Sequence, residues 1–400
     1  MHLQPLSHSN PNYDIVVIGG GPVGLSAAYQ CAKTGKRVLL LERYCFKNDR
    51  GSSTGNSRFW RIMYSESYLS KLAMETSPLW DQWETEAQTE LIRRTGLLNF
   101  GETNIGDSPE GSLHTAIETM QQLGIQHELL TSREIHEKYP FRDLPRDFIG
   151  VFQKDAGAIN VREVLDFLLK RCRDFGVTLL ENSEVTGISN AQDGVEVYSS
   201  IGMFKGTKVI LCPGAYAKSL LKIMKLDLNM LVWEMTSAYF RRTDKNTNYP
   251  LWFQFKKATS GKSELFYGFP DLSWDQPGFC KIAVDFSSKV FDDPEKRDHT
   301  PSGADLEMTV NFVKRHLIGV DSVPLLQSTC VMGILPDNNF ILDFAPATIP
   351  GNKDIVICAS GWAFKFVPIL GKICAELAME GKTAHDISHY AATRSGVLLQ

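Results

Sequence analysis

The sequence lacks any long hydrophobic run: no stretch approaches the about 18 to 20 apolar residues that a membrane-spanning helix requires. It also lacks a strong charge bias, because its formal net charge is only −4 over 400 residues, so nucleic acid is not an expected partner. Residues 1–14 have neither the apolar stretch of a signal peptide nor the arginine-rich pattern of a transit peptide. The terminal "GVLLQ" matches no peroxisomal signal. These absences predict a cytoplasmic protein without membrane contact.

The eight cysteines form no C-x-x-C pair and no spacing typical of a metal site. We therefore expect no bound metal, and thiols that are reduced and mostly buried. The chain also lacks internal repeats and low-complexity tracts. With 43 % apolar residues, its 400 residues are enough for a large core and two domains.

A strand, a glycine turn, a helix and a second strand form the clearest pattern, over residues 13–43, "YDIVVIGGGPVGLSAAYQCAKTGKRVLLLER". The apolar runs 15–18 and 38–41 are continuous rather than alternating, which is typical of parallel strands buried on both faces. The pattern predicts a βαβ unit.

Gly19, Gly21 and Gly24 fit the G-x-G-x-x-G pattern directly after the first predicted strand. Such glycines permit a tight turn, close approach of a pyrophosphate, and close packing of helix on strand. Glu42 ends the second strand, where an acidic side chain binds ribose hydroxyls and disfavours a 2′-phosphate. The motif predicts a dinucleotide site, with a ligand-free glycine turn as the alternative. FAD and NAD share this motif, so it does not distinguish them.

The rest of the chain alternates between two sequence patterns: amphipathic helices with antiparallel strands, and the strand-turn-helix pattern of the N-terminal region. Long amphipathic helices are expected from about residue 62, one strand at 91–102, and aromatic-rich antiparallel strands over 228–290. Residues 291–305 have the composition of a solvated loop. The strand-turn-helix pattern of the N-terminal region then recurs, in the strand "DIVICAS" (354–360), the turn "GWAFKF" (361–366) and a following helix.

This alternation predicts an α/β protein with a discontinuous dinucleotide-binding domain. We expect that domain in residues 1–61, 150–227 and 320–400. An inserted α+β substrate domain with an antiparallel sheet is expected in residues 62–149 and 228–319.

Four further stretches resemble the monomeric sarcosine oxidase family of flavin amine oxidases, within the group that includes D-amino-acid and glycine oxidases. They are "GSSTGNSRFWRIMY" (51–64), "YGFP…FCK" (267–281), "STCVMGILPDNNFILDF" (328–344) and "GWAFKF" (361–366). The resemblance covers about residues 13 to 390 and is greatest to the branch that oxidises piperideine-2-carboxylate. It implies a Rossmann-like FAD-binding domain of the D-amino-acid-oxidase (GR2) type, a monomer, and FAD as the cofactor.

The resemblance also implies that FAD is attached covalently through Cys330. The residues alone predict a buried, reduced thiol at any of the eight cysteines. The dinucleotide motif already predicts Gly19, Gly21, Gly24 and Glu42 as cofactor contacts. The other expected cofactor contacts are Arg43, Ser52, Thr54, Val185, Gly214, Gly361, Phe364 and Lys365.

Two arginines match family positions near the flavin (Arg58) and against the substrate carboxylate (Arg61). We expect both on a helical segment, where residues three apart share a face. A solvated basic turn is the alternative. Ser53 and Thr54 replace the His-His pair of the sarcosine oxidases, which argues against a plain sarcosine oxidase.

Lys281 matches the lysine with which the family activates O2, and Tyr267 matches a tyrosine near the substrate. Lys281 alternates with Cys280 and Ile282 on a strand, so it could equally point to solvent. Tyr267 could equally be a core aromatic residue.

Lys365 matches the second cation of a substrate-carboxylate clamp with Arg61. Trp362 replaces a smaller ring of the sarcosine oxidases and favours a flat cyclic substrate by stacking. The resemblance therefore implies a cyclic secondary amine or imine carboxylate, whose oxidation by O2 yields hydrogen peroxide. Glu110, Glu234 and Asp285 are unranked candidates for tuning the substrate amine.

Other functions remain open at this point. Sarcosine or another N-methyl amino acid is an alternative substrate, and a dehydrogenase with a different electron acceptor is an alternative enzyme. An aromatic-ring hydroxylase is disfavoured because the chain contains no "GDA". A non-catalytic flavin-binding protein would leave the cations at 58, 61 and 365 incidental.

Overall fold

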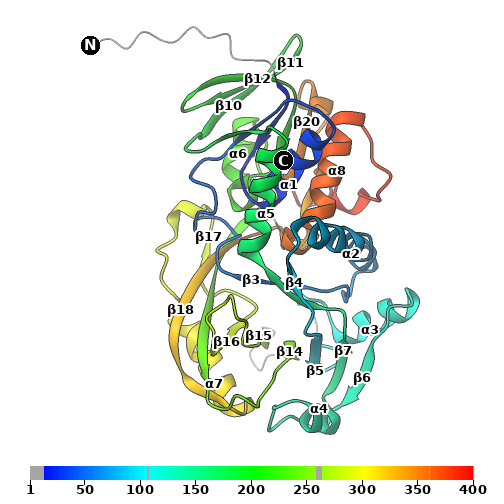
Figure 1. Cartoon of the computed structure of the whole chain (residues 1–400), viewed down its shortest axis with the longest axis vertical. Coiled ribbons are helices and arrows are strands. Elements are labelled where there is room, and N and C mark those ends of the chain that lie inside the picture. The colour runs from blue at the N-terminus through cyan, green and yellow to red at the C-terminus, as the bar shows by residue number, and fades with distance from the viewer. Residues whose placement is uncertain (1–12, 106–107, 258–263, 360, 400) are drawn as a thin grey trace.

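The computed structural model describes residues 13–105, 108–257, 264–359 and 361–399. Residues 1–12, which carry most of the segment without a signal-peptide pattern, and residue 400 lie outside this part. Two large sheets organise the molecule: the first occupies the upper half of Figure 1 and the second the lower half.

The first sheet has eight strands and a parallel centre. β1 lies between β2 and β12, parallel to both, and β12 pairs in parallel with β20. This confirms the predicted βαβ unit, with α1 (Pro22–Lys33) as its helix. The strands are β1 (Tyr13–Ile18), β2 (Val38–Leu41), β9 (Thr178–Leu180), β10 (Val185–Ala191), β11 (Gly194–Ser199), β12 (Gly202–Leu211), β19 (Ile341–Phe344) and β20 (Ile355–Ala359).

Both faces of this sheet are buried, which explains its continuous apolar runs. Ile15 and Val17 pack into the cluster formed with α1, α2, α5 and α8, whereas Val16 and Ile18 pack on the other side with α6. These helices are α2 (Ser67–Ala87), α5 (Val161–Asp174), α6 (Ala217–Ile223) and α8 (Val367–Glu380). No helix in the described residues is long and apolar enough to cross a bilayer.

The second sheet has nine strands and is antiparallel except where β5 and β14 run in parallel. Helix α7 (Gly303–His316) covers one face, where Phe312 stacks on Trp252 and Phe266. The strands are β5 (Leu97–Gly101), β6 (Glu128–Thr131), β7 (Ile149–Gln153), β13 (Leu231–Arg242), β14 (Leu251–Lys256), β15 (Glu264–Phe269), β16 (Phe279–Val284), β17 (Val290–Phe291) and β18 (Val320–Ile334).

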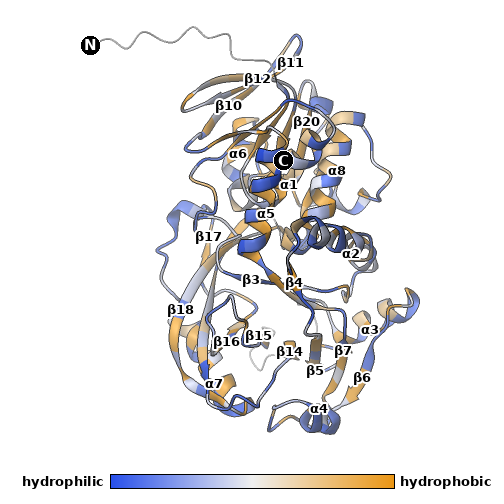
Figure 2. Cartoon of the chain, viewed as in Figure 1, coloured by the Kyte–Doolittle hydropathy of each residue, from blue (hydrophilic) through white to orange (hydrophobic). Residues whose placement is uncertain are grey.

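A small third sheet and short helices connect these parts. β3 (Ser57–Trp60), β8 (Gly157–Asn160) and β4 (Ile92–Arg93) form the sheet. The strands of both large sheets are mostly hydrophobic, whereas α4 is largely hydrophilic (Figure 2). The remaining helices are α3 (Leu113–Gln122), α4 (Ser132–Lys138), and the 3₁₀ helices η1 (Gly214–Tyr216), η2 (Pro294–Lys296), η3 (Asn352–Asp354), η4 (Ala363–Phe366) and η5 (Ser388–Tyr390).

The structure corrects three expectations about the elements. The strand expected at 91–102 is two strands in different sheets, β4 and β5, separated at Gly96, whose φ is +75°. Residues 150–153 and 320–334, expected in the dinucleotide domain, lie in β7 and β18, which are hydrogen-bonded into the second sheet. The loop expected to be solvated at 291–305 contains η2 and the buried residues Arg297, Ser302 and Asp305. The remaining domain boundaries stay predictions.

Helices α1 and α8 approach so closely that a glycine is needed between them. A Cβ on Gly371 of α8 would lie 2.0 Å from Ser26 Oγ and 2.4 Å from Ser26 Cβ. Such overlap forces the helices apart rather than filling a void.

We predict that Gly371→Ala lowers the free energy of unfolding by about 1 to 3 kcal/mol. Urea denaturation measures the change. Gly303→Ala at the start of α7 is the matched control, because a Cβ there meets nothing within 4 Å. Equal free energies of unfolding for Gly371→Ala and Gly303→Ala would contradict the close contact between α1 and α8.

Candidate functional site

A cavity of about 970 Å³ lies between the ends of the first-sheet strands and one face of the second sheet. It is lined by nearly all of the predicted site residues, and the exceptions are Gly24, Arg61 and the unranked candidate Glu234. Those that line it are Gly19, Gly21, Glu42, Arg43, Ser52, Thr54, Arg58, Val185, Gly214, Tyr267, Lys281, Cys330, Gly361, Trp362, Phe364 and Lys365.

The glycine turn leaves the N-terminus of α1 open to this cavity. Gly21 is the N-cap of α1 and has no side chain to cap the helix, and a Cβ there would meet no atom within 4 Å. Gly19 has φ +106°, a conformation that favours glycine. A Cβ on Gly24 would lie 1.9 Å from the Gly19 carbonyl oxygen, so Gly24 acts by packing behind the turn.

Glu42 is held rigidly at the same end of the cavity. Its carboxylate accepts hydrogen bonds from the backbone N–H groups of Gly20, at 2.6 Å, and Tyr44, at 2.9 Å. Burial raises the pKa of Glu42, and these two N–H groups oppose the shift. An uncapped helix N-terminus next to a fixed carboxylate fits the pyrophosphate and ribose of a dinucleotide.

One face of the second sheet forms the cavity floor, because side chains alternate between faces along each strand. Lys281 therefore points into the cavity, while Cys280 and Ile282 pack in the core beneath α7. Lys281 is only 7 % exposed, so the solvent-facing alternative is wrong. The floor residues are Met235, Ser237, Tyr239, Phe253, Tyr267, Phe269, Lys281, Leu326, Ser328, Cys330 and Met332.

Lys281 lies in a setting that weakens its protonation. Burial lowers its pKa first, the charge of Arg58 lowers it further, and Asp275 opposes the shift. Asp275 is itself held in place, because it accepts hydrogen bonds from the Tyr239 hydroxyl at 2.9 Å and the Asn56 amide at 3.2 Å.

Arg58 and Arg61 lie on or next to a strand, not on a helix, so the expected shared face is wrong. Arg58 is in β3, which is held straight by antiparallel pairing with β8. Its guanidinium donates to the carbonyls of Ser52 and Thr54, both at 2.6 Å, and of its neighbour Ser57 at 2.8 Å. Arg58 thus fixes the loop that crosses the cavity.

Arg61 is buried and forms an ion pair with Glu110. It faces a second, small cavity of about 20 Å³ rather than the main one, while Glu110 lines both. Asp285 lines the main cavity too. Burial and the charge of Glu110 raise the pKa of Asp285 well above its ordinary value, against the opposing effects of Arg61 and Lys365.

Lys365 is the other cation of this cluster and lines the main cavity. It lies on η4, whose backbone is fixed where Trp80 Nε1 donates to the Lys365 carbonyl at 2.9 Å. Its ammonium nitrogen is 5.5 Å from the Tyr64 ring centroid and 6.0 Å from that of Trp362. Burial, followed by the charge of Arg61, lowers its pKa to about 7.

Glu234 is not in the cavity, so it is not a candidate for tuning the substrate. It is fully buried on β13, where its carboxylate lies 3.8 Å from Lys289 Nζ and 3.9 Å from Arg297 Nη1.

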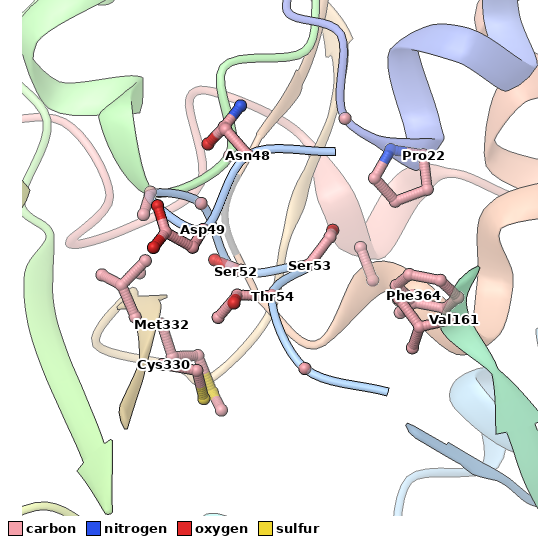
Figure 3. Close-up of a pocket in the computed structure, with 18 of the residues that line it drawn as sticks. Pro22, Asn48, Asp49, Ser52, Ser53, Thr54, Val161, Cys330, Met332 and Phe364 are labelled. Carbon is pink, nitrogen blue, oxygen red and sulfur yellow. The ribbon is translucent and has the colours of Figure 1, made fainter. Parts of the chain in front are cut away.

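Cys330 faces the cavity from β18 and is half-buried. In Figure 3 it lies beside Met332, next to the loop that carries Asp49, Ser52 and Thr54. Cys212 and Cys358 line the cavity as well.

Three aromatic residues of the floor, Phe253, Tyr267 and Phe269, form a cluster with Phe59 that is here called the aromatic wall. This cluster was not expected from the sequence. Phe59 lies with ring centroids 4.7 Å from Phe253, 5.8 Å from Tyr267 and 4.2 Å from Phe269. Tyr267 and Phe269 are two apart on β15, and Phe253 is directly opposite Tyr267 on β14. The two-residue spacing in "YGF" indicates a common face, but the sequence does not reveal the pairing with β14.

Known proteins resemble this chain over most of its length. The family model "DAO: FAD dependent oxidoreductase" matches residues 14–377. A probable sarcosine oxidase of Arabidopsis thaliana is 31 % identical over 379 residues, which cover 92 % of this chain and 88 % of that protein. A putative bifunctional amine oxidase of Dictyostelium discoideum is 39 % identical over 97 % of this chain, which spans only 38 % of that longer protein.

A solved structure of NikD, described as an unusual amino acid oxidase essential for nikkomycin biosynthesis, has the same fold. It is 37 % identical with a TM-score of 0.88, and the alignment covers 95 % of this chain and 97 % of NikD. The resemblance to flavin-dependent amine and amino-acid oxidases is therefore confirmed. A family match over most of the chain, together with a cavity that fits a dinucleotide, shows that this chain belongs to the DAO family of FAD-dependent oxidoreductases.

Proposed function

We propose that this chain is an oxidase of a cyclic amino or imino acid, of the piperideine-2-carboxylate or pipecolate type. The observation that carries the proposal is the half-buried ammonium of Lys365 next to Trp362 in a cavity with an aromatic wall. When bound, FAD accepts a hydride from the carbon next to the substrate nitrogen and passes the electrons to O2, which yields hydrogen peroxide.

Lys365 is the residue that we assign to the substrate carboxylate. Its half-buried charge is unfavourable without an anion, and no ion pair satisfies it in the described part of the chain. Arg61 was expected to share this task, but it is already paired with Glu110 behind the cavity wall. We therefore assign Arg61 to holding Glu110 in place and raising the positive potential beside Lys365.

Trp362 and the aromatic wall support a flat ring as the substrate. Aromatic faces stack on planar groups and fix their orientation, and orientation is the main requirement for hydride transfer. The raised pKa of Asp285 favours its protonated form, which can donate a hydrogen bond to the substrate. Tyr267, which is part of this wall, is assigned to contact with the substrate ring.

Lys281 is assigned to the oxidative half-reaction. An ammonium on the cavity floor stabilises the negative charge that develops while O2 is reduced. The position of Asp275 supports this role, because its charge favours the protonated form of Lys281.

A panel of cyclic, N-methyl and primary amino acids tests the proposed substrate class. We expect a cyclic imino or amino acid to reduce the flavin fastest without O2, and to release peroxide in air. Reduction by sarcosine but by no cyclic substrate would favour the N-methyl amino acid alternative, which the similarity to a probable sarcosine oxidase supports. Turnover with dyes but not with O2 would favour a dehydrogenase.

We predict that Lys365→Met lowers kcat/KM for carboxylate substrates by about a hundredfold, because a buried ion pair to the substrate is lost. Steady-state peroxide release measures kcat/KM. The flavin should remain bound to the variant. Lys382→Met, which removes an exposed lysine, is the control. Unchanged kcat/KM in Lys365→Met would rule out its assignment to the carboxylate.

Covalent attachment of FAD through Cys330 predicts that the yellow colour stays with acid-precipitated protein. Cys330→Ser should release the flavin into the supernatant, whereas Cys358→Ser, which changes another cysteine of the cavity, should not. Release from the unsubstituted protein, or retention by Cys330→Ser, would contradict the assignment.

A further inference from the structure

Residues 292–299, here called the strap, leave the second sheet after β17 and contact the segment that follows β2 of the first sheet. They follow β17, seen at the left of Figure 1, and their side chains Asp293 and Glu295 line the main cavity. The strap thus closes part of the cavity wall instead of extending into solvent.

The tip of the strap contacts the segment that follows β2. The Glu295 carboxylate accepts a hydrogen bond from the Tyr44 hydroxyl and lies 3.7 Å from Arg43 Nη1. It also lies 3.9 Å from Arg50 Nη1, and Arg297 Nη2 donates to the Arg50 carbonyl at 3.2 Å. The Glu295 carboxylate and the Arg297 guanidinium therefore connect the second sheet to the segment after β2.

These contacts lie at the end of the cavity where the AMP half of a dinucleotide belongs. In a βαβ site the pyrophosphate lies at the helix N-terminus, and the adenosine ribose lies by the acid that ends the second strand, here Glu42. Arg43 and Tyr44 follow that acid directly. The Arg43 guanidinium lies 5.2 Å from the ring centroids of both Tyr44 and Tyr216, which also line the cavity.

The base of the strap is attached much more firmly than its tip. Arg297 and Glu234 form a pair whose side chains are 1 % and 0 % exposed. Lys289 Nζ donates to Asp298 at 2.6 Å and to the Thr300 carbonyl at 2.8 Å. At the tip, by contrast, the side chains of Arg43, Glu295 and Arg50 are 33 %, 41 % and 49 % exposed. Exposed ion pairs are weak, so the tip can open while the base remains on β13.

We propose that the strap is a latch on the AMP half of FAD, with Glu295 as the residue that fastens it to Tyr44 and Arg43. Opening of the tip admits the cofactor, and closing retains it until the flavin end is fixed. The proposal depends on the cofactor alone and not on the identity of the substrate.

The test measures FAD release from Cys330→Ser holoprotein, in which the flavin is free to exchange. The rise of flavin fluorescence on dilution gives the dissociation rate. Glu295→Gln should raise this rate by about tenfold, the loss expected for a charged hydrogen bond. Tyr44→Phe should have a similar effect, and the double variant should add little to either. If release is too fast to follow, FAD can be titrated into the apoproteins and its fluorescence quenching measured. The Kd of Glu295→Gln should then be about tenfold above that of the background protein.

Two controls separate the latch from a general loosening of the fold. Asp292→Asn removes a strap carboxylate that pairs with exposed Lys296, so it should change FAD release less than twofold. FMN lacks the AMP half, so its Kd should be the same in Glu295→Gln and in the background protein. An FAD rate within twofold of background in Glu295→Gln, or equal weakening of FMN and FAD, would overturn the proposal.

Discussion

The burial of positive charge around one cavity is the constraint on which the site depends. Arg58 is satisfied by loop carbonyls and Arg61 by Glu110, so both act as parts of the framework. Lys281 and Lys365 also lie at the cavity, where burial lowers the pKa of each. A cavity built in this way favours anionic ligands, because an anion relieves the cost of burying an ammonium group. The proposed carboxylate substrate follows from this imbalance.

The two sheets contribute different parts of the chemistry. The first supplies the glycine turn and Glu42, which depend on local backbone geometry at the ends of parallel strands. The second supplies a face whose alternate residues place Lys281, Cys330 and most of the aromatic wall on one surface, and Phe59 of β3 completes that wall. The strap then joins the second sheet to the segment after β2 through the hydrogen bond from Tyr44 to Glu295.

Local features of the site could be predicted from the sequence, whereas features that depend on distant pairing could not. Gly19, Gly21, Gly24 and Glu42 lie within one βαβ unit, and the structure places them as expected. Arg58 was wrongly expected on a helix because its strand is set by β8, about a hundred residues away. Glu110 and Asp285 could not be ranked above Glu234, since only the fold brings the first two to the cavity. The roles of all these residues remain predictions, as do covalent FAD and the substrate.

The most direct test of the central claim is the number of protons taken up when an anion binds. Lys365, with a pKa of about 7, is mostly neutral at about pH 8, and a bound carboxylate favours its ammonium form. Calorimetry of benzoate binding in buffers of different ionisation enthalpy should therefore show an uptake close to one proton, absent in Lys365→Met. Binding without proton uptake, or an uptake unchanged in Lys365→Met, would contradict the account.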